Sequence, residues 1–414
     1  MRAAIAALVT AIIASAAAAG TRQEAPPIGA SAAILMDAET GQVLYEKNAD
    51  ERRAIASTTK VMTALLILER GKLDAVCSVS ERAAETPQCS IWLKRGERLR
   101  LDELLTAALV KSANDACVAA AEAVAGSEEA FVKLMNERAR ELGAGNTHFV
   151  NTNGLYAPRH FSTARDLALI TRVAMQQPKF RELVSARQAT IPWPGKDCQR
   201  LLVNKNRLLS ILPGADGVKT GYVKESGQCL VASAARHGWR LIAVLLDSPD
   251  LWQEAPALLE YGFGNFRPLC FAQRGKPAMV VQVRGGAREQ VGLVPSGSLM
   301  LVLPKWSDEQ YTPRVELARS HIDAPVRARQ KLGRMVLTAG RRELMAVDLL
   351  AGEEVPRSLL SNIRFGTTWF VFSLVAAAMV VRTYSVATKR HRTRRIDVRS
   401  ALVQREPRSR ASVR

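Results

Sequence analysis

Two residues near the start of the chain have types and a spacing that suit acyl transfer. Ser57 and Lys60 are three positions apart, and residues 57–70 predict a helix with apolar side chains around most of its circumference. The spacing puts both side chains on one face of that helix. A desolvated lysine loses its proton more easily, and the neutral amine can then activate a serine hydroxyl as a nucleophile. The ordinary alternative is an N-capping serine followed by a surface lysine.

A second pair, Ser112 and Asn114, falls between two predicted helices at residues 101–110 and 116–124. Side chains in such a break can project into a cleft, where a hydroxyl could relay a proton and an amide could hold a substrate's peptide group. The alternative is a helix N-cap, a role that Asn114 or Asp115 would fill at the start of the second helix.

A third group, Lys219-Thr220-Gly221, lies on a predicted strand that leads into a hairpin formed by residues 228–234 and 240–246. A cation beside a hydroxyl suits a carboxylate ligand, and glycine lets a substrate backbone approach closely. The alternative is an ordinary turn at the end of a strand. Each group alone is weak evidence, but the three together predict one site.

The elements that would position these groups predict an α+β fold with one antiparallel sheet flanked by helices. Residues 32–48 predict a β-hairpin, and further helices are predicted at 128–142, 163–176 and around 256–261. Beyond Phe266 the pattern changes to short strands separated by turn residues, which predicts a small all-β domain. The strands of that domain are predicted at 279–284, 299–303, 314–317, 333–338 and 344–349.

The order Ser-x-x-Lys, Ser-x-Asn, Lys-Thr-Gly, on a helix, an inter-helix loop and a strand, is the signature of penicillin-binding proteins and class A β-lactamases. From about Ala32 to Ala351 the chain resembles the low-molecular-weight penicillin-binding proteins, the serine-type D-Ala-D-Ala carboxypeptidases of peptidase family S11. The similar stretches are Leu35–Gly41, Ala56–Leu66, Ser112–Ala116, Phe149–Asn151, Ser162–Ala168 and Pro213–Tyr222. The resemblance implies a penicillin-binding/β-lactamase-like transpeptidase domain at 27–265, followed by a small all-β domain at 266–355.

The resemblance also implies an activity, the removal of the terminal D-alanine from peptidoglycan stem pentapeptides, which regulates cross-linking. Ser57, activated by Lys60, would form the acyl-enzyme, and Ser112 would help to protonate the leaving amine. The backbone N–H groups of Ser57 and Tyr222 would form the oxyanion hole, and β-lactam antibiotics would acylate the same serine. No cofactor is implied. The substrate-binding residues would be Asn114, Lys219, Thr220, Gly221 and Tyr222.

Two other functions share part of this pattern. A β-lactamase would need an efficient base for deacylation, typically the glutamate of a Glu-x-x-Leu-Asn pattern, and no such pattern occurs between Asn114 and Lys219. A catalytically silent cell-wall binding protein would not need the intact set of catalytic side chains. The chain departs from many family members at residues 247–252, where a basic residue often helps to bind the substrate carboxylate and none is present here.

Composition argues against nucleic-acid binding and against a metal enzyme. The formal net charge is +19, but residues 382–414 contain 11 Lys and Arg against two acids and so account for about half of the excess. The six cysteines form no C-x-x-C pair, and the five histidines are scattered. The sequence therefore predicts no metal site and no Ser/His/Asp triad.

The two ends of the chain predict export and membrane attachment. Residues 1–19 have a basic start, an apolar run and small residues near the end, as a signal peptide does. Residues 365–381 are apolar and uncharged, which predicts a transmembrane helix at 364–382. The basic residues at 383–414 would then form a cytoplasmic tail, with the catalytic domain outside the cell membrane.

Overall fold

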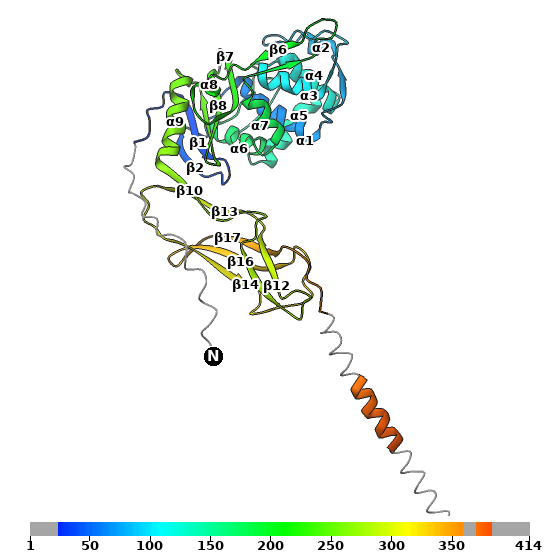
Figure 1. Ribbon diagram of the computed structural model, residues 1–414. Coiled ribbons are helices and arrows are strands. Elements are labelled where there is room, and N and C mark those ends of the chain that lie inside the picture. Colours follow the sequence, from blue (N-terminus) through cyan, green and yellow to red (C-terminus); the bar gives the residue numbers. More distant parts are fainter. Residues whose placement is uncertain (1–23, 359–369, 383–414) are drawn as a thin grey trace, which may run out of the picture. The chain divides into compact units, whose positions relative to one another are not determined.

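The computed structural model describes residues 24–358 and 370–382 (Figure 1). The predicted signal peptide at 1–19, the predicted tail at 383–414 and residues 364–369 of the predicted transmembrane helix lie outside the described residues. Among the described residues, no helix is both long and apolar enough to cross a membrane.

The chain forms two compact units. The first contains the residues up to Leu269 together with Met300–Asp308, and the second contains Cys270–Leu299 and the residues from Glu309 onward. All six cysteines are free thiols, so no disulfide bond supports either unit.

A five-stranded antiparallel sheet forms the centre of the first unit, with strand order β2-β1-β9-β8-β7. Its strands are β1 (Ala32–Asp37), β2 (Val43–Lys47), β7 (Ala215–Val223), β8 (Gly227–Arg236) and β9 (Trp239–Leu246). The first hairpin therefore pairs with the last one through β1 and β9, although about 200 residues separate them in the chain. The predicted α+β architecture, with one antiparallel sheet flanked by helices, is confirmed.

Most helices of the first unit cover one face of this sheet (Figure 1). The helix α1 (Lys60–Arg70) is buried from Lys60 to Ile67, because it lies among the other helices and against the sheet. This position explains its apolar circumference. The helices that share this core are α3 (Leu101–Thr106), α4 (Asn114–Ala125), α5 (Glu128–Glu141), α6 (Ala164–Ala174) and α7 (Pro178–Ser185).

The opposite face of the sheet carries a second, smaller core. The helix α9 (Leu251–Asn265) packs there with the short α8 (Leu208–Ile211). Val302 joins this core, because the Gln42 side-chain amide bonds its backbone oxygen at 2.8 Å and its backbone N–H at 3.2 Å. The chain thus enters the second unit at Cys270 and returns to the first unit at Met300–Asp308.

The local structure differs from the predictions near the site. The predicted helix at 57–70 begins with a 3₁₀ turn, η1 (Ala56–Thr59), before α1. The predicted helix at 101–110 continues through a π-helical turn, η2 (Ala107–Lys111), and α4 begins at Asn114. The break between these helices is therefore only Ser112-Ala113. The sequence analysis missed α2 (Glu81–Ala84), α7 and α8, and the short strand pairs β3 (Val76–Ser78) with β4 (Arg98–Arg100) and β5 (Gln188–Ile191) with β6 (Arg200–Val203).

The second unit is built on a six-stranded sheet with strand order β14-β16-β17-β12-β11-β15, in which only β11 and β15 run parallel. The predicted all-β domain is therefore confirmed. The predicted strand at 299–303 forms as β13 (Leu299–Pro304), but it pairs with β10 (Phe266–Ala272) and not with this sheet. The sheet contains β11 (Met279–Arg284), β12 (Gln290–Pro295), β14 (Tyr311–Leu317), β15 (Ile322–Asp323), β16 (Lys331–Ala339) and β17 (Arg342–Ala351).

Candidate active site

The predicted nucleophile and base are in contact at the junction of η1 and α1. The Nζ atom of Lys60 lies 2.8 Å from the Oγ atom of Ser57. The same nitrogen lies 2.8 Å from Asn114 Oδ1 and 2.6 Å from the carbonyl oxygen of Asn153. Lys60 is fully buried, and this desolvation lowers its pKa, while the negative charge of Asp115 acts in the opposite direction. The environment therefore favours a neutral amine beside the serine hydroxyl.

The backbone before Ser57 is strained. Ala56 has a φ of +45°, a left-handed backbone conformation that residues other than glycine rarely adopt. The carbonyl of Ala56 packs directly against Gly154, where a Cβ would lie 1.9 Å from its oxygen, so only glycine at position 154 leaves room for this turn. The segment that carries Gly154 also supplies the Asn153 carbonyl that accepts from Lys60. Strain of this kind costs on the order of 1–3 kcal/mol and is often found at functional sites.

Asn114 is oriented by a loop that the sequence analysis did not assign to the site. Its Nδ2 atom donates to the carbonyl oxygen of Pro87 at 2.9 Å, so its Oδ1 atom faces Lys60. Its backbone N–H donates to the carbonyl oxygen of Cys89 at 2.7 Å. The amide group is thus held at both ends, and its oxygen is ready to stabilise a protonated Lys60.

The same loop, residues 87–93, is also bound by Asp115, the residue after Asn114. Its buried carboxylate accepts from the Ser90 hydroxyl at 2.6 Å and from the backbone N–H groups of Ile91 and Leu93, each at 3.1 Å. A carboxylate that accepts several backbone bonds is a strong organiser of a loop. The alternative N-cap role of Asp115 or Asn114 does not hold, because Ala113 takes the N-cap position of α4, without a side-chain cap.

Ser112 lies between the two helices, as predicted. Its φ of +67° places it in the left-handed region, and its side chain is almost fully buried. Within the part of the chain that the structure describes, no hydrogen-bond partner is present for the hydroxyls of Ser112 and Thr220. Both hydroxyls are therefore available to a ligand.

Lys219 and Gly221 lie on β7, on the face of the sheet that is covered by α1. Lys219 is buried, and its Nζ atom donates to the Thr220 carbonyl oxygen at 3.0 Å. Burial, followed by the charge of Lys60, lowers the pKa of Lys219 to about 7. A Cβ on Gly221 would lie 2.9 Å from the backbone nitrogen of Ser57, so the strand touches the nucleophile's own backbone. Tyr222, the next residue, is exposed.

The structure thus brings Ser57, Lys60 and Asn114 into direct contact and places Gly221 against them. Sequence reasoning missed the carbonyl of Asn153, because every residue has a backbone carbonyl and no side-chain pattern marks one. It also missed Lys205, whose charge lowers the pKa of both Lys60 and Lys219. A lone lysine carries no signal in sequence; only the fold shows that it is near the site.

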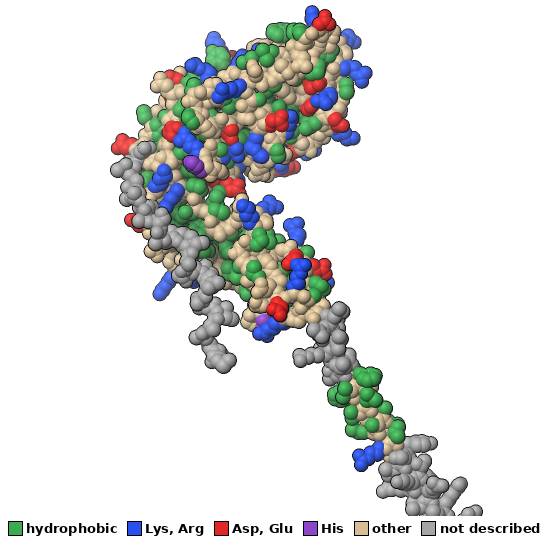
Figure 2. Space-filling view, viewed as in Figure 1, with side chains coloured by type: hydrophobic (Ala, Val, Ile, Leu, Met, Phe, Trp, Pro, Cys, Tyr) green, Lys and Arg blue, Asp and Glu red, His purple; other side chains and the backbone are tan. Residues whose placement is uncertain are grey.

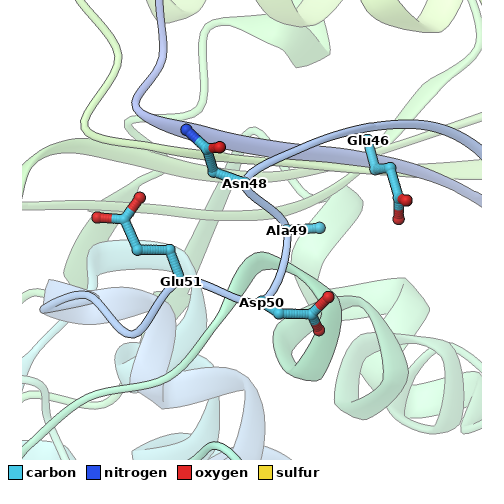
Figure 3. A pocket seen from close by; sticks show the side chains of 5 residues that line it. All are labelled: Glu46, Asn48, Ala49, Asp50 and Glu51. Atoms are coloured by element: carbon cyan, nitrogen blue, oxygen red, sulfur yellow. The ribbon is translucent and has the colours of Figure 1, made fainter.

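A separate pocket is lined by the end of β2 and the segment that follows it, and it does not belong to this site (Figure 3). Arg165 bonds Glu46 and Asp50 of this pocket at distances from 2.5 to 3.1 Å, so these acids are neutralised. The lining includes no serine, lysine or histidine that could act as a nucleophile or base. The lining residues are Glu46, Asn48, Ala49, Asp50 and Glu51.

A serine hydroxyl bonded to a buried lysine, with an amide and a second buried lysine close by, defines a serine–lysine acyl-transfer site. Comparison with known proteins gives its family. Residues 19–250 match the family model described as D-alanyl-D-alanine carboxypeptidase, Peptidase_S11, and residues 266–357 match the C-terminal domain of penicillin-binding protein 5. The chain belongs to peptidase family S11, the low-molecular-weight penicillin-binding proteins.

Named relatives and solved structures agree with this assignment. D-alanyl-D-alanine carboxypeptidase DacF of Bacillus subtilis is 34% identical over 80% of this chain and 86% of its own. DacD of Escherichia coli is 33% identical over 75% of this chain and 83% of its own. The crystal structure of penicillin binding protein 5 from Haemophilus influenzae is similar with a TM-score of 0.66 and 28% identity, covering 81% of this chain and all of that one.

Proposed function

We infer that this protein is a serine-type D-Ala-D-Ala carboxypeptidase that removes the terminal D-alanine from peptidoglycan stem peptides and is acylated by β-lactams. The observation that carries this inference is the 2.8 Å contact between Lys60 Nζ and Ser57 Oγ in a buried site of a family S11 chain. The names of the similar proteins support the same reaction. The product is a shortened stem peptide, which regulates cross-linking.

In the proposed mechanism Lys60 takes the proton of Ser57, and the serine oxygen attacks the carbonyl carbon between the two D-alanines. The backbone N–H groups of Ser57 and Tyr222 stabilise the oxyanion. Ser57 lies in the first turn of a helix, where N–H groups have no intrahelical partner, and Tyr222 lies on β7 beside it. The bond to the terminal D-alanine then breaks as Ser112 gives its hydroxyl proton to the leaving amine and receives in exchange the proton that Lys60 took from Ser57. Water hydrolyses the acyl-enzyme and restores Ser57.

The remaining roles concern the substrate. Asn114 holds the peptide amide, and its position between Lys60 and Pro87 fixes the direction of its side chain. Lys219 and Thr220 receive the terminal carboxylate, and Thr220 offers a hydroxyl with no partner in the described structure. Gly221 keeps β7 close to Ser57, and Tyr222 contributes its backbone N–H group.

The test is intact-protein mass spectrometry with benzylpenicillin, combined with an assay for D-alanine release from a D-Ala-D-Ala peptide. The wild type should gain one stoichiometric adduct and release D-alanine, whereas Ser57→Ala should do neither. Ser185→Ala, which changes an exposed serine at the end of α7, is the matched control and should behave as the wild type.

Two outcomes would contradict the proposal. The absence of an adduct on folded wild-type protein would rule out the acyl-enzyme and favour a silent cell-wall binding protein. Rapid hydrolysis of benzylpenicillin without a lasting adduct would identify a β-lactamase instead.

We also propose that the protein is exported and held in the cell membrane by a single segment at 364–382, with its catalytic domain outside and residues 383–414 in the cytoplasm. The support comes from the apolar runs near both ends of the chain. In addition, the helical residues 370–382 expose large apolar side chains, including Phe370, Phe372 and Met379 (Figure 2). Fractionation should recover the full chain with membranes and a chain ending at residue 358 in the soluble fraction; equal solubility would contradict anchoring.

A further inference from the structure

A buried glutamate outside the group of predicted site residues holds the segment that carries the Asn153 carbonyl. Glu128 is the first residue of α5 and is buried. Its Oε1 atom accepts from the Thr152 backbone N–H at 3.0 Å and from the Thr152 hydroxyl at 2.8 Å. Its Oε2 atom pairs with Arg82 at 2.8 Å. Both carboxylate oxygens are thus engaged, one of them by the residue that directly precedes Asn153.

Thr152 is held from α1 as well. The Thr63 hydroxyl, one turn after Lys60, donates to the Thr152 carbonyl oxygen at 2.6 Å, and both threonines are fully buried. The N–H group, the hydroxyl and the carbonyl of Thr152 are therefore all bonded. Because the Thr152 carbonyl and the Asn153 N–H group share one peptide plane, these bonds limit the directions in which the next carbonyl, that of Asn153, can point.

The direction of the Asn153 carbonyl matters for the base. The Nζ atom of Lys60 lies 2.6 Å from this carbonyl oxygen and 2.8 Å from Asn114 Oδ1. It also lies 2.8 Å from Ser57 Oγ. A neutral lysine amine has two N–H groups and one lone pair, and the two oxygens of the asparagines can only accept, so they take both N–H groups. The lone pair is then left for the Ser57 hydroxyl, as a general base requires.

The neighbouring glutamate separates this contact from the other effects of an acid at this place. Glu129 follows in the first turn of α5, pairs with the same Arg82 and has a side chain that is 62% exposed. Among the described residues it makes no bond to Thr152. Both glutamates place negative charge at the N-terminus of α5, but only Glu128 holds the segment that leads to Asn153.

We propose that Glu128 is a positioning residue: it holds Thr152 so that the Asn153 carbonyl turns the lone pair of Lys60 toward Ser57. This inference rests on the proposed function, in which Lys60 is the base for Ser57. Glu128 acts through Thr152, and what it supplies there is an acceptor oxygen and not a charge. It should therefore affect the rate of the chemical step and leave the binding of ligands unchanged.

The test measures both the rate of benzylpenicillin adduct formation and the final number of adducts per protein molecule. Glu128→Ala should lower the rate about tenfold, because a displacement of about half an ångström in a reacting group has that effect, and should still reach one adduct per molecule. Glu128→Gln loses the charge as alanine does but keeps an acceptor oxygen for Thr152, so it should restore most of the rate. With a D-Ala-D-Ala peptide, Glu128→Ala should lower kcat and leave KM nearly unchanged.

Glu129→Ala is the matched control, because it removes a carboxylate from the same turn and from the same partner, Arg82. It should be acylated at the wild-type rate. Thr63→Val tests the proposal from the other side of Thr152, since it removes the hydroxyl that donates to the Thr152 carbonyl. It should also slow acylation, and it decides the question if Glu128→Ala does not fold.

Several outcomes would overturn the proposal. A wild-type rate in folded Glu128→Ala would show that Thr152 needs no such support. An equal loss in Glu129→Ala, or a Glu128→Gln variant as slow as Glu128→Ala, would assign the effect to charge. Fewer acylated molecules that react at an unchanged rate would show a folding defect. If the wild type itself is not acylated at Ser57, it is the proposed function that fails.

Discussion

Gly221→Ala is expected to slow the acylation of Ser57 by about tenfold while the protein remains folded. The added Cβ would lie 2.9 Å from the Ser57 backbone nitrogen, 3.0 Å from the Ala56 Cβ and 3.1 Å from the Ile55 carbonyl oxygen. Ordinary contacts of a Cβ begin near 3.4 Å, so β7 and η1 would have to separate. Gly221 is not among the residues with positive φ, and the cost therefore comes from contact and not from backbone strain.

The magnitude follows from the size of this separation. Relief of all three contacts requires a shift of about 0.5 Å between the strand and the nucleophile's turn, by comparison with the 3.4 Å limit. A misplacement of 1 Å can cost about 100-fold in rate, and half of that displacement corresponds to about tenfold. The same overpacking should lower the free energy of unfolding by about 1–3 kcal/mol, which a domain of this size tolerates.

The assay is the rate of benzylpenicillin adduct formation by mass spectrometry, together with a thermal unfolding curve for each variant. Gly145→Ala is the matched control, because a Cβ there would meet nothing within 4 Å and the residue has no positive φ. It should acylate at the wild-type rate and unfold at the same or a slightly higher temperature. If Gly221→Ala folds and acylates as fast as the wild type, β7 does not position the nucleophile and the reasoning is wrong.

Three further predictions follow from single contacts. Asn114→Asp puts a carboxylate 2.8 Å from Lys60 Nζ and should raise the pKa of Lys60. The acylation rate should therefore fall at neutral pH and recover as the pH rises. The pH–rate profile of Asn114→Ala, which adds no charge, should not show this recovery. His160 is buried, its Nδ1 accepts from Val150 N–H and its Nε2 is bonded to the Thr59 hydroxyl, and burial lowers its pKa from 6.5 to about 4. The unfolded chain therefore binds a proton at a higher pH than the folded protein does, and the free energy of unfolding should fall by up to about 3 kcal/mol as the pH drops from 6.5 to 4. Urea unfolding of His160→Gln should not show this fall. Glu254→Ala removes an acceptor from Gly29 N–H, Ala30 N–H and the Ser248 hydroxyl, so urea unfolding should show a loss of about 3 kcal/mol, while the acylation rate of the folded protein stays unchanged because α9 packs on the face of the sheet opposite α1.

The parts of the site that the sequence could predict are those set by local spacing. Ser57 and Lys60 are three residues apart on one helix, and that separation alone brings their side chains together. The apolar circumference of α1 predicted its burial, and burial is what lowers the pKa of Lys60. The main strands were predictable for a similar reason, because β-branched and apolar runs between turns mark them without long-range information.

The parts that could not be predicted depend on contacts between distant segments or on the backbone. The carbonyl oxygen of Asn153 accepts from Lys60 across 93 residues of sequence. The Pro87 and Cys89 carbonyls that hold Asn114 leave no mark in side-chain type. The helices around Ser112 were predicted with a five-residue break, but a π-helical turn carries the first helix to Lys111, and no propensity rule anticipates such a turn.

Several unfavourable features of the first unit lie around Ser57, as is common at functional sites. Lys60 and Lys219 are buried, and neither is bonded to a carboxylate. This desolvation destabilises their charged forms and lowers the pKa of both lysines. Ala56, which directly precedes Ser57, and Ser112, which lies between η2 and α4, both adopt left-handed backbone conformations. A fold chosen for stability alone would replace these residues with apolar side chains and relaxed turns. Their retention in one place is explained by what they do together, since a neutral lysine beside a serine hydroxyl requires desolvation, and a nucleophile held against β7 requires a strained turn.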